Sequence, residues 1–167
     1  GTCTVGHPEV VSVSTGMDER EFVSVAASAE SDSEHPLGQA VVAYAARTGI
    51  AIPEHSGFES VTGGGVRCSV EGRDAIVGSR RFLSENGIEA PEDADSDASE
   101  GRTCILVAID GAYAGSISIM DPMRPESPAA VSALIDDGKK VMMVTGDRRS
   151  TAEHIAGELG ISEVRSE

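Results

Sequence analysis

The residues best placed to do chemistry are a histidine and a proline at the entrance of an apolar helical segment. His35-Pro36 follows a short acidic stretch and precedes an apolar run over residues 37–46. Proline suits the first helical position and fixes its own φ, so the neighbouring imidazole is held in a defined place. Such a ring can hold a planar ligand, for example a nucleotide base. The alternative is that His35 only caps the helix or lies on the surface.

Three glycines form a second candidate group. Gly63 and Gly65 belong to a Gly-Gly-Gly-Val segment, and Gly78 follows a short apolar run. Positions without a Cβ let the backbone approach a ligand closely and let N–H groups point at it. The chain has neither a strand-G-x-G-x-x-G-helix fingerprint nor a G-K-[ST] phosphate loop. The alternative is structural: a turn or bulge at Gly63 and Gly65, and a strand-to-helix turn at Gly78.

A third group lies in the last third of the chain. Asp121 and Arg124 could form a salt bridge, or Arg124 could lie near a phosphate. Thr145-Gly146-Asp147 follows the apolar run 141–144. The carboxyl end of such a strand is where open α/β sheets bind their ligands. The alternative for Asp121 and Arg124 is a proline-bounded linker with two solvated side chains.

Two helices are the first elements that must position these groups. Asp18 followed by Glu21 is a capping-box pattern, and helical periodicity continues to Glu30. A second helix is predicted over 36–47, with 31–35 as the polar connector. The pattern predicts an antiparallel helix pair with His35 at the junction.

The middle of the chain has the alternation typical of strands. Glu71-Gly72-Arg73 predicts a tight turn, and Asp110-Gly111 is a strong hairpin signal. The predicted strands cover 66–70, 75–77, 103–109 and 113–119, with a short helix over 79–86 and a solvated acidic loop over 89–101. Helices combined with these hairpins indicate an α+β unit, in which an antiparallel sheet is covered by helices.

The pattern changes at Met120. A helix is predicted over 125–136, a buried parallel strand over 141–144 and another helix over 150–159. This order indicates a piece of a doubly wound α/β domain, to which the first residues of the chain also belong. The predicted boundaries are 1–8 for the N-terminal piece of that domain, 9–119 for the inserted α+β unit, and 120–167 for the second piece.

The composition excludes several classes of partner. The chain has 167 residues, a net charge of −15, 40% apolar residues, 3% aromatic residues and no Trp. So acidic a protein is poorly suited to nucleic acid or an anionic membrane, and few aromatics leave no stacking platform for single strands. A site for a phosphate ligand must then draw its positive potential from backbone N–H groups, Arg or Mg²⁺.

The cysteines and the hydropathy give two further expectations. Cys3, Cys68 and Cys104 are odd in number and widely spaced, which favours buried free thiols over a disulfide framework or a metal site. No apolar run approaches the roughly 18 residues of a membrane helix, so we expect a soluble piece of a larger protein.

Taken in order, these motifs resemble the ATP-binding region of the heavy-metal-transporting P-type ATPases. The segments that carry the resemblance are Ser33-Glu34-His35-Pro36-Leu37, Gly63-Gly64-Gly65-Val66, Val77-Gly78-Ser79, Asp121-Pro122-Met123-Arg124-Pro125-Glu126 and Val144-Thr145-Gly146-Asp147. The opening Gly1-Thr2-Cys3-Thr4 is similar to the end of that family's phosphorylation motif. The resemblance implies an α+β nucleotide-binding domain inserted in a partial α/β haloacid-dehalogenase-like phosphorylation domain. It places the phosphorylated Asp upstream of Gly1.

The resemblance also implies roles for single residues. The family's His-Pro histidine, here His35, contacts adenine, and the glutamate that matches Glu30 accepts the exocyclic amino group and favours ATP over GTP. The resemblance places Gly63, Gly65 and Gly78 beside the nucleotide, assigns Thr2, Asp121, Arg124, Thr145, Gly146 and Asp147 to the phosphorylation domain, and gives no metal ligand in this chain. Arg148 stands where the family has Asn, which departs from its local phosphate geometry. The family's final Gly-Asp-Gly-x-Asn-Asp segment, which holds Mg²⁺, is absent.

The implied activity is hydrolysis of ATP, via an aspartyl-phosphate, coupled to the transport of a heavy-metal cation. Its cofactors are ATP and Mg²⁺, and the cargo is Cu⁺ or, as a second choice, Zn²⁺ or Cd²⁺. The piece is expected to be a monomeric, inactive cytoplasmic domain of an integral membrane protein. Its implied partners are ATP and the transmembrane and actuator domains of the same polypeptide. The alternatives are a soluble haloacid-dehalogenase-like phosphatase and a non-catalytic docking module.

Overall fold

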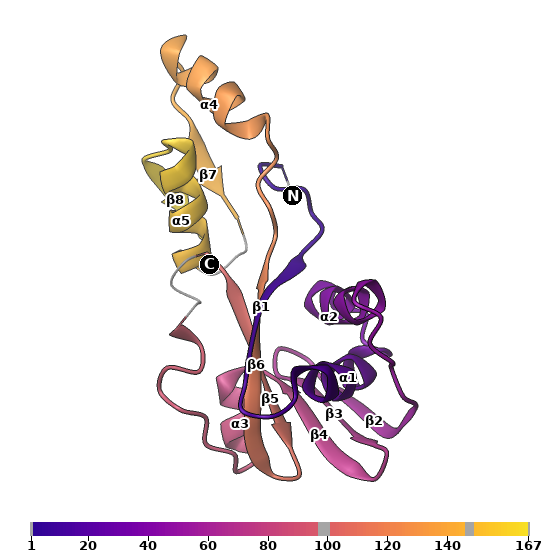
Figure 1. The fold of residues 1–167 in the computed structure, drawn as a ribbon. Helices are drawn as coiled ribbons and strands as arrows, with labels where there is room; N and C mark the ends of the chain where they lie inside the picture. Colours follow the sequence, from indigo (N-terminus) through magenta and orange to yellow (C-terminus); the bar gives the residue numbers. More distant parts are fainter. Residues whose placement is uncertain (1, 97–100, 146–148, 167) are drawn as a thin grey trace.

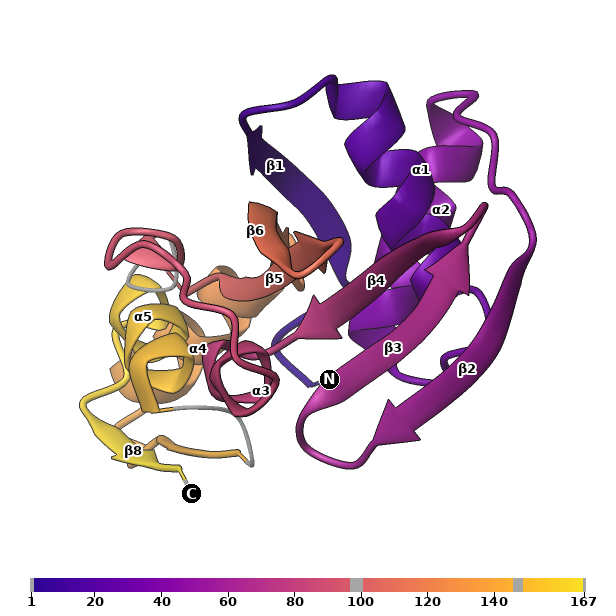
Figure 2. The ribbon, with the colours of Figure 1, turned by 90° about the horizontal axis from the view of Figure 1, so that it is seen from below.

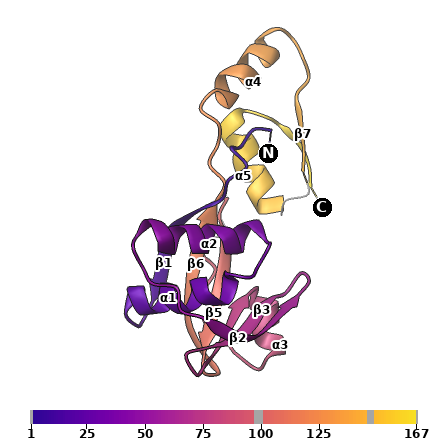
Figure 3. The same ribbon diagram turned by 90° about the vertical axis from the view of Figure 1, so that its right-hand side faces the viewer.

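Two units of different architecture make up the chain (Figure 1). The computed structural model describes residues 2–96, 101–145 and 149–166. The first unit is a six-stranded sheet with helices packed on it, and the second is a small α/β unit beyond one end of that sheet (Figure 3). The N-terminal segment runs beside the chain that leads from the first unit into the second.

All neighbouring strands of the six-stranded sheet are antiparallel. Their order is β1 (Glu9–Thr15), β6 (Ala112–Met120), β5 (Thr103–Ile109), β4 (Arg73–Gly78), β3 (Gly65–Val70) and β2 (His55–Val61). Two hairpins close through the two-residue turns Glu71-Gly72 and Asp110-Gly111, whose φ angles lie between 50° and 83°. Positive φ at both positions is typical of a type I′ turn, whose twist matches that of the strands. Both predicted hairpins are confirmed, whereas β1 and β2 are not among the predicted strands.

Helices α1 (Glu19–Glu30) and α2 (Pro36–Arg47) cover one face of the sheet (Figure 2). Both agree with the predicted helices, and the Asp18 side chain caps α1 by accepting a hydrogen bond from Glu21 N at 3.0 Å. The core between helices and sheet is largely aliphatic, as the composition requires. Its residues without exposed surface include Phe22, Val23, Val41, Val77 and Val107.

On the opposite face, α3 (Arg80–Glu85) and the acidic loop form a smaller core around Leu83 and Leu106. The loop was predicted to be solvated, and most of residues 89–96 are exposed, but Ala90, Ala94 and Asp95 are partly buried. Ala90 and Ala94 pack against the small core, and Arg80 Nη2 lies 2.6 Å from Asp95 Oδ1. The same guanidinium donates to backbone carbonyls of the loop, so one cation holds the acidic segment against the sheet. Residues 97–100 lie outside the described residues.

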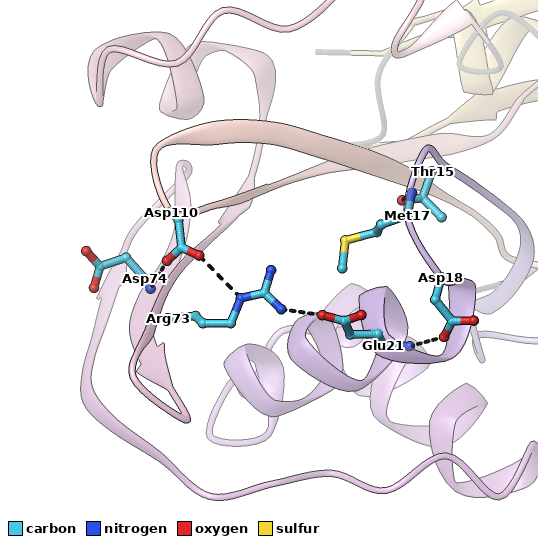
Figure 4. A network of polar contacts seen from close by, with 7 residues as sticks. All are labelled: Thr15, Met17, Asp18, Glu21, Arg73, Asp74 and Asp110. Atoms are coloured by element: carbon cyan, nitrogen blue, oxygen red, sulfur yellow. Dashed lines mark hydrogen bonds and ion pairs between the residues drawn. The ribbon is translucent and has the colours of Figure 1, made fainter.

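Arg73 joins the two turns to α1 at the hairpin end of the sheet (Figure 4). Its guanidinium forms an ion pair with Glu21, and its Nε lies 3.3 Å from Asp110 Oδ2. Asp110 Oδ1 also accepts a hydrogen bond from Asp74 N at 3.0 Å. A partly exposed ion pair contributes only about 0–1 kcal/mol. The network therefore orients the first turn of α1 on the sheet more than it stabilises the fold.

The second unit contains α4 (Ser127–Asp136), β7 (Met142–Val144), α5 (Arg149–Leu159) and β8 (Glu163–Arg165). Strands β7 and β8 are parallel, as predicted for this part of the chain, although β8 was not predicted. The prediction that 141–144 is buried is wrong, because Met142 is 42% and Val144 73% exposed. Met143 faces the apolar cluster with α4 and α5, and in the described chain the helices cover only that face of the two strands.

The N-terminal segment binds to the chain that follows β6. Val5 N donates to Pro122 O, and Arg124 N donates to Cys3 O, both at 2.9 Å. These bonds flank an antiparallel bridge between Thr4 and Met123. The chain segments that enter and leave the first unit therefore lie side by side.

Candidate functional site

A pocket of ≈ 500 Å³ lies where the loop between α1 and α2 meets the start of β3, the end of β4 and the start of β5. We call it the glycine pocket. Its walls include Ser33 to Gly38 on one side and Ser60 to Val66 on the other. The five residues predicted to bind a nucleotide, namely Glu30, His35, Gly63, Gly65 and Gly78, all line this pocket. The fold thus brings together side chains and backbone from four separate segments.

His35 is both the N-cap of α2 and part of the pocket wall. Its Nδ1 accepts a hydrogen bond from Leu37 N at 3.2 Å, and Pro36 occupies the first helical position. In a neutral imidazole whose Nδ1 accepts, the ring hydrogen is on Nε2. The cap therefore fixes the tautomer and leaves Nε2 as a donor. The structural alternative, a capping histidine, is confirmed without excluding a ligand role.

Glu30 ends helix α1 and is only 6% exposed. Burial raises the pKa of its carboxyl above the usual value, and a hydrogen bond from Ser33 opposes that rise. The Ser33 oxygen also accepts a hydrogen bond from His35 N at 3.3 Å. Ser33 thus links the carboxyl group and the histidine, so the two candidate side chains are parts of one local structure.

The structure explains why glycine is required at these three positions, and the reasons differ from the predicted close approach to a ligand. Gly63 has a φ of 72° in the turn between β2 and β3. Gly65 and Gly78 are cross-strand partners, and a Cβ on Gly65 would lie 2.1 Å from Val77 O. A Cβ on either of these two residues would also lie 2.9 Å from the Phe82 ring. Their first role is therefore to let strands β3 and β4 and the Phe82 ring approach one another.

Asp121 and Arg124 hold the N-terminal segment. Asp121 Oδ2 accepts from Thr4 Oγ1 at 2.6 Å, and its Oδ1 accepts from Gly6 N at 2.9 Å. Partial burial raises the pKa of Asp121, but these hydrogen bonds are among the interactions that outweigh it, so the net pKa is lowered. Arg124 Nε donates to Thr4 O at 2.9 Å. Both side chains therefore connect the two strands of chain between the units.

The other predicted phosphorylation-domain residues lie away from the glycine pocket. Thr2 is exposed in the N-terminal segment. Thr145 follows β7, and its N–H donates to Arg165 O at 3.0 Å. Gly146 and Asp147 lie outside the described residues. The residues that line the pocket include none of the described members of this group.

Several pocket residues were missed by sequence reasoning. Ser33 and Gly38 lie beneath Glu30, and Thr103 to Ile105 bring the start of β5 into the wall. Gly38 could have been noticed, because it interrupts a run of residues that otherwise favour a helix. The contribution of β5 depends on its pairing with β4, which has no local signal.

Two kinds of feature are absent from the described chain. Over residues 2–96, 101–145 and 149–166, no group of three or more His, Cys, Asp or Glu side chains could hold a metal ion. No helix in these same ranges is long and apolar enough to cross a membrane.

Comparisons with known proteins show the family of the chain. The model of the haloacid dehalogenase-like hydrolases matches residues 1–166, and the chain belongs to that family. It is 40% identical over 172 residues to copper-transporting ATPase 2 of Rhizobium meliloti (strain 1021), covering 100% of this chain and 21% of the relative. It is 41% identical over 172 residues to the silver exporting P-type ATPase of Salmonella typhimurium, covering 99% and 21%.

Solved structures of heavy-metal P-type ATPases are also similar to this chain. One is a zinc-transporting PIB-type ATPase in its E2.Pi state, with 32% identity and a TM-score of 0.79. The match covers 99% of this chain and 27% of the ATPase chain. The catalytic CPx-ATPase domain CopB-B matches 99% and 57%, with 28% identity and a TM-score of 0.72. The predicted resemblance to heavy-metal P-type ATPases and the predicted fold class are confirmed. The chain spans about a fifth of the length of the curated relatives it matches.

Proposed function

We propose that the glycine pocket binds the adenosine end of ATP, and that the chain is the ATP-binding cytoplasmic portion of a heavy-metal-transporting P-type ATPase. The observation that carries the proposal is the convergence of Glu30, His35, Gly63, Gly65 and Gly78 on one pocket. The names of the relatives, which are copper-transporting and silver-exporting ATPases, support the same proposal.

In this proposal, the two side chains and the glycines have different tasks. The His35 ring lies against the base or donates from Nε2, while the Glu30 carboxylate accepts the exocyclic amino group of adenine. The turn at Gly63 and the close pair Gly65 and Gly78 present backbone rather than side chains to the ligand. Such a site, whose described wall residues include no arginine or lysine, binds ATP weakly, with a Kd on the order of 0.1–1 mM.

The proposed reaction is transfer of the γ-phosphoryl group of ATP to an aspartate carboxylate that is not in this chain. The carboxylate oxygen attacks the γ-phosphorus, the bond to the leaving ADP oxygen breaks, and water later hydrolyses the acyl phosphate. We assign Thr2, Asp121, Arg124, Thr145, Gly146 and Asp147 to the phosphorylation domain, with boundaries 1–8 and 120–167 around the nucleotide-binding domain 9–119. Following the family resemblance, we assign no ligand of Mg²⁺ to this chain.

The proposed cargo is Cu⁺, with Zn²⁺ or Cd²⁺ as alternatives. Copper appears in the names of several relatives, whereas another relative is named a silver exporter. The proposed partners are the transmembrane and actuator domains of the same polypeptide, on the cytoplasmic side of the membrane.

A nucleotide titration followed by amide NMR shifts tests the ATP site. With ATP we expect saturable shifts around Glu30, His35 and the turn at Gly63, and weaker shifts with GTP. His35→Ala removes the ring and the cap together, whereas His35→Asn keeps a good N-cap and removes only the ring. Loss of affinity in both variants supports contact with the base. Loss only in His35→Ala means that the cap alone matters, and no saturable shift at several millimolar ATP contradicts the proposed function.

A further inference from the structure

Gly38 lies directly beneath the carboxyl group of Glu30. A Cβ built on Gly38 would lie 2.2 Å from Glu30 Oε2, 3.0 Å from Glu30 Cδ and 3.0 Å from Ser33 Oγ. A carbon atom does not approach an oxygen to 2.2 Å without one of them moving. Any side chain at position 38 must therefore displace the Glu30 carboxylate. We call the space above Gly38 the carboxylate seat.

No backbone reason explains a glycine at this position. The residue lies in the first turn of α2, and its φ is not among the positive φ angles of the described glycines. Glycine in a helix costs about 1 kcal/mol relative to alanine. The steric reason that remains is the carboxylate seat itself.

The seat holds the carboxylate in a defined electrostatic environment. The first turn of a helix carries partial positive charge and favours an anion there. The Ser33 hydroxyl donates a hydrogen bond to the same carboxyl group. Glu30 also lines the glycine pocket, so its carboxyl oxygens are available to a donor on a ligand there.

We infer that Gly38 is a specificity-determining residue, because the carboxylate seat fixes Glu30 as a hydrogen-bond acceptor at the wall of the glycine pocket. This inference rests on the proposed function. A base with an exocyclic amino group at C6, such as adenine, donates to that acceptor. A 6-oxo base presents a second acceptor to it, and the two oxygens repel each other. The pocket therefore prefers ATP to ITP, which differ at this position of the base.

Binding of ATP and of ITP to the same set of variants tests the inference. The wild type is expected to bind ATP about tenfold more tightly than ITP. Gly38→Ala is expected to reduce that ratio to below about threefold, because the acceptor is displaced. Gly157→Ala is the matched control, since it lies in helix α5 with nothing within 4 Å of its added Cβ, and it keeps the wild-type ratio. An unchanged ratio in Gly38→Ala overturns the inference, even if both affinities fall.

A thermal-denaturation cycle separates the seat from the ATP proposal. Gly38→Ala should lower Tm in the wild type but have little effect in a Glu30→Ala background, where no carboxylate occupies the seat. If the effects of Gly38→Ala and Glu30→Ala on Tm are additive, the Glu30 carboxylate does not occupy the carboxylate seat. If the cycle shows coupling while the wild type binds neither nucleotide, the seat stands, and both the proposed function and the specificity role fail. If the wild type prefers ATP but the cycle is additive, the inference fails and the proposed function stands.

Discussion

Nε2 of His55 lies 3.2 Å from Asp32 Oδ2, and this contact joins the first residue of β2 to the loop between α1 and α2. Nδ1 of the same ring lies 3.3 Å from Ser31 Oγ, whose hydroxyl donates to Ser28 O at 2.8 Å. The His55 side chain is 9% exposed, and its ring also packs on Phe58 with centroids 5.6 Å apart. His55 therefore holds, from outside the glycine pocket, the loop whose inner side carries Ser33 and His35.

Replacing this histidine should loosen the loop. His55→Leu keeps a buried apolar side chain but leaves Asp32 and Ser31 without the ring, so we expect a loss of about 1–2 kcal/mol in the free energy of unfolding. Urea denaturation measures that loss, and hydrogen exchange should show faster exchange at Ser33 and Glu34. His7→Leu, in the N-terminal segment, is the control. If the His55 variant is as stable as the wild type, His55 does not hold the loop between α1 and α2 in place.

Glu30 should make the protein less stable as its carboxyl group ionises. Burial raises the pKa of this group above the ordinary value of 4.5, so the folded state holds the proton more tightly than the unfolded chain. Its contribution to stability is present below pH 4.5 and is lost as the pH rises through the folded-state pKa. Glu30→Gln cannot ionise, so it should be more stable than the wild type at pH 7, with a difference that shrinks towards pH 4. Chemical denaturation at several pH values checks this, and a constant difference across that range argues against it.

The paired glycines should tolerate no side chain. Gly65→Ala and Gly78→Ala each place a Cβ against backbone atoms and the Phe82 ring, so we expect losses of about 1–3 kcal/mol or more. Gly16→Ala is the matched control, since nothing lies within 4 Å of its Cβ. Phe82→Leu in the Gly65→Ala background should restore only part of the stability, because Val77 O remains in the way. Full rescue would mean that the ring, not the backbone, is the obstacle.

Much of this architecture could be predicted because its signals are local. The capping pair Asp18 and Glu21, the turns at Glu71-Gly72 and Asp110-Gly111, and the His-Pro helix start each specify a conformation within a few residues. The hairpins and both long helices followed from them. Glu30, His35 and the glycines line one pocket, while the nucleotide-binding roles that the family resemblance implies for them stay a prediction.

The failures concern interactions between distant segments. The exposure of Val144 depends on how many helices cover β7, which its apolar sequence does not record. The contact of the acidic loop with Arg80 was not predicted, because Arg80 lies on another element, which precedes the loop. The steric meaning of Gly38 needs the position of Glu30, eight residues earlier on a different helix. In each case the missing information was a tertiary neighbour, while the local conformation had been predicted correctly or nearly so.

The hydrogen bonds between Asp121 and the N-terminal segment should control how firmly the two units are joined. Asp121→Ala removes the acceptors for Thr4 Oγ1 and Gly6 N, so we expect faster hydrogen exchange at Val5 and Gly6 and a loss of about 1–2 kcal/mol. The pKa of Asp121 is lowered from 3.8, so this stabilisation is present above that pH and is lost as the pH falls through the folded-state value. Asp136→Ala, which removes an exposed carboxylate at the end of α4, is the control. If exchange at Val5 and Gly6 stays at the wild-type rate in Asp121→Ala, the backbone bonds from Val5 N and Arg124 N hold the segment without the carboxylate.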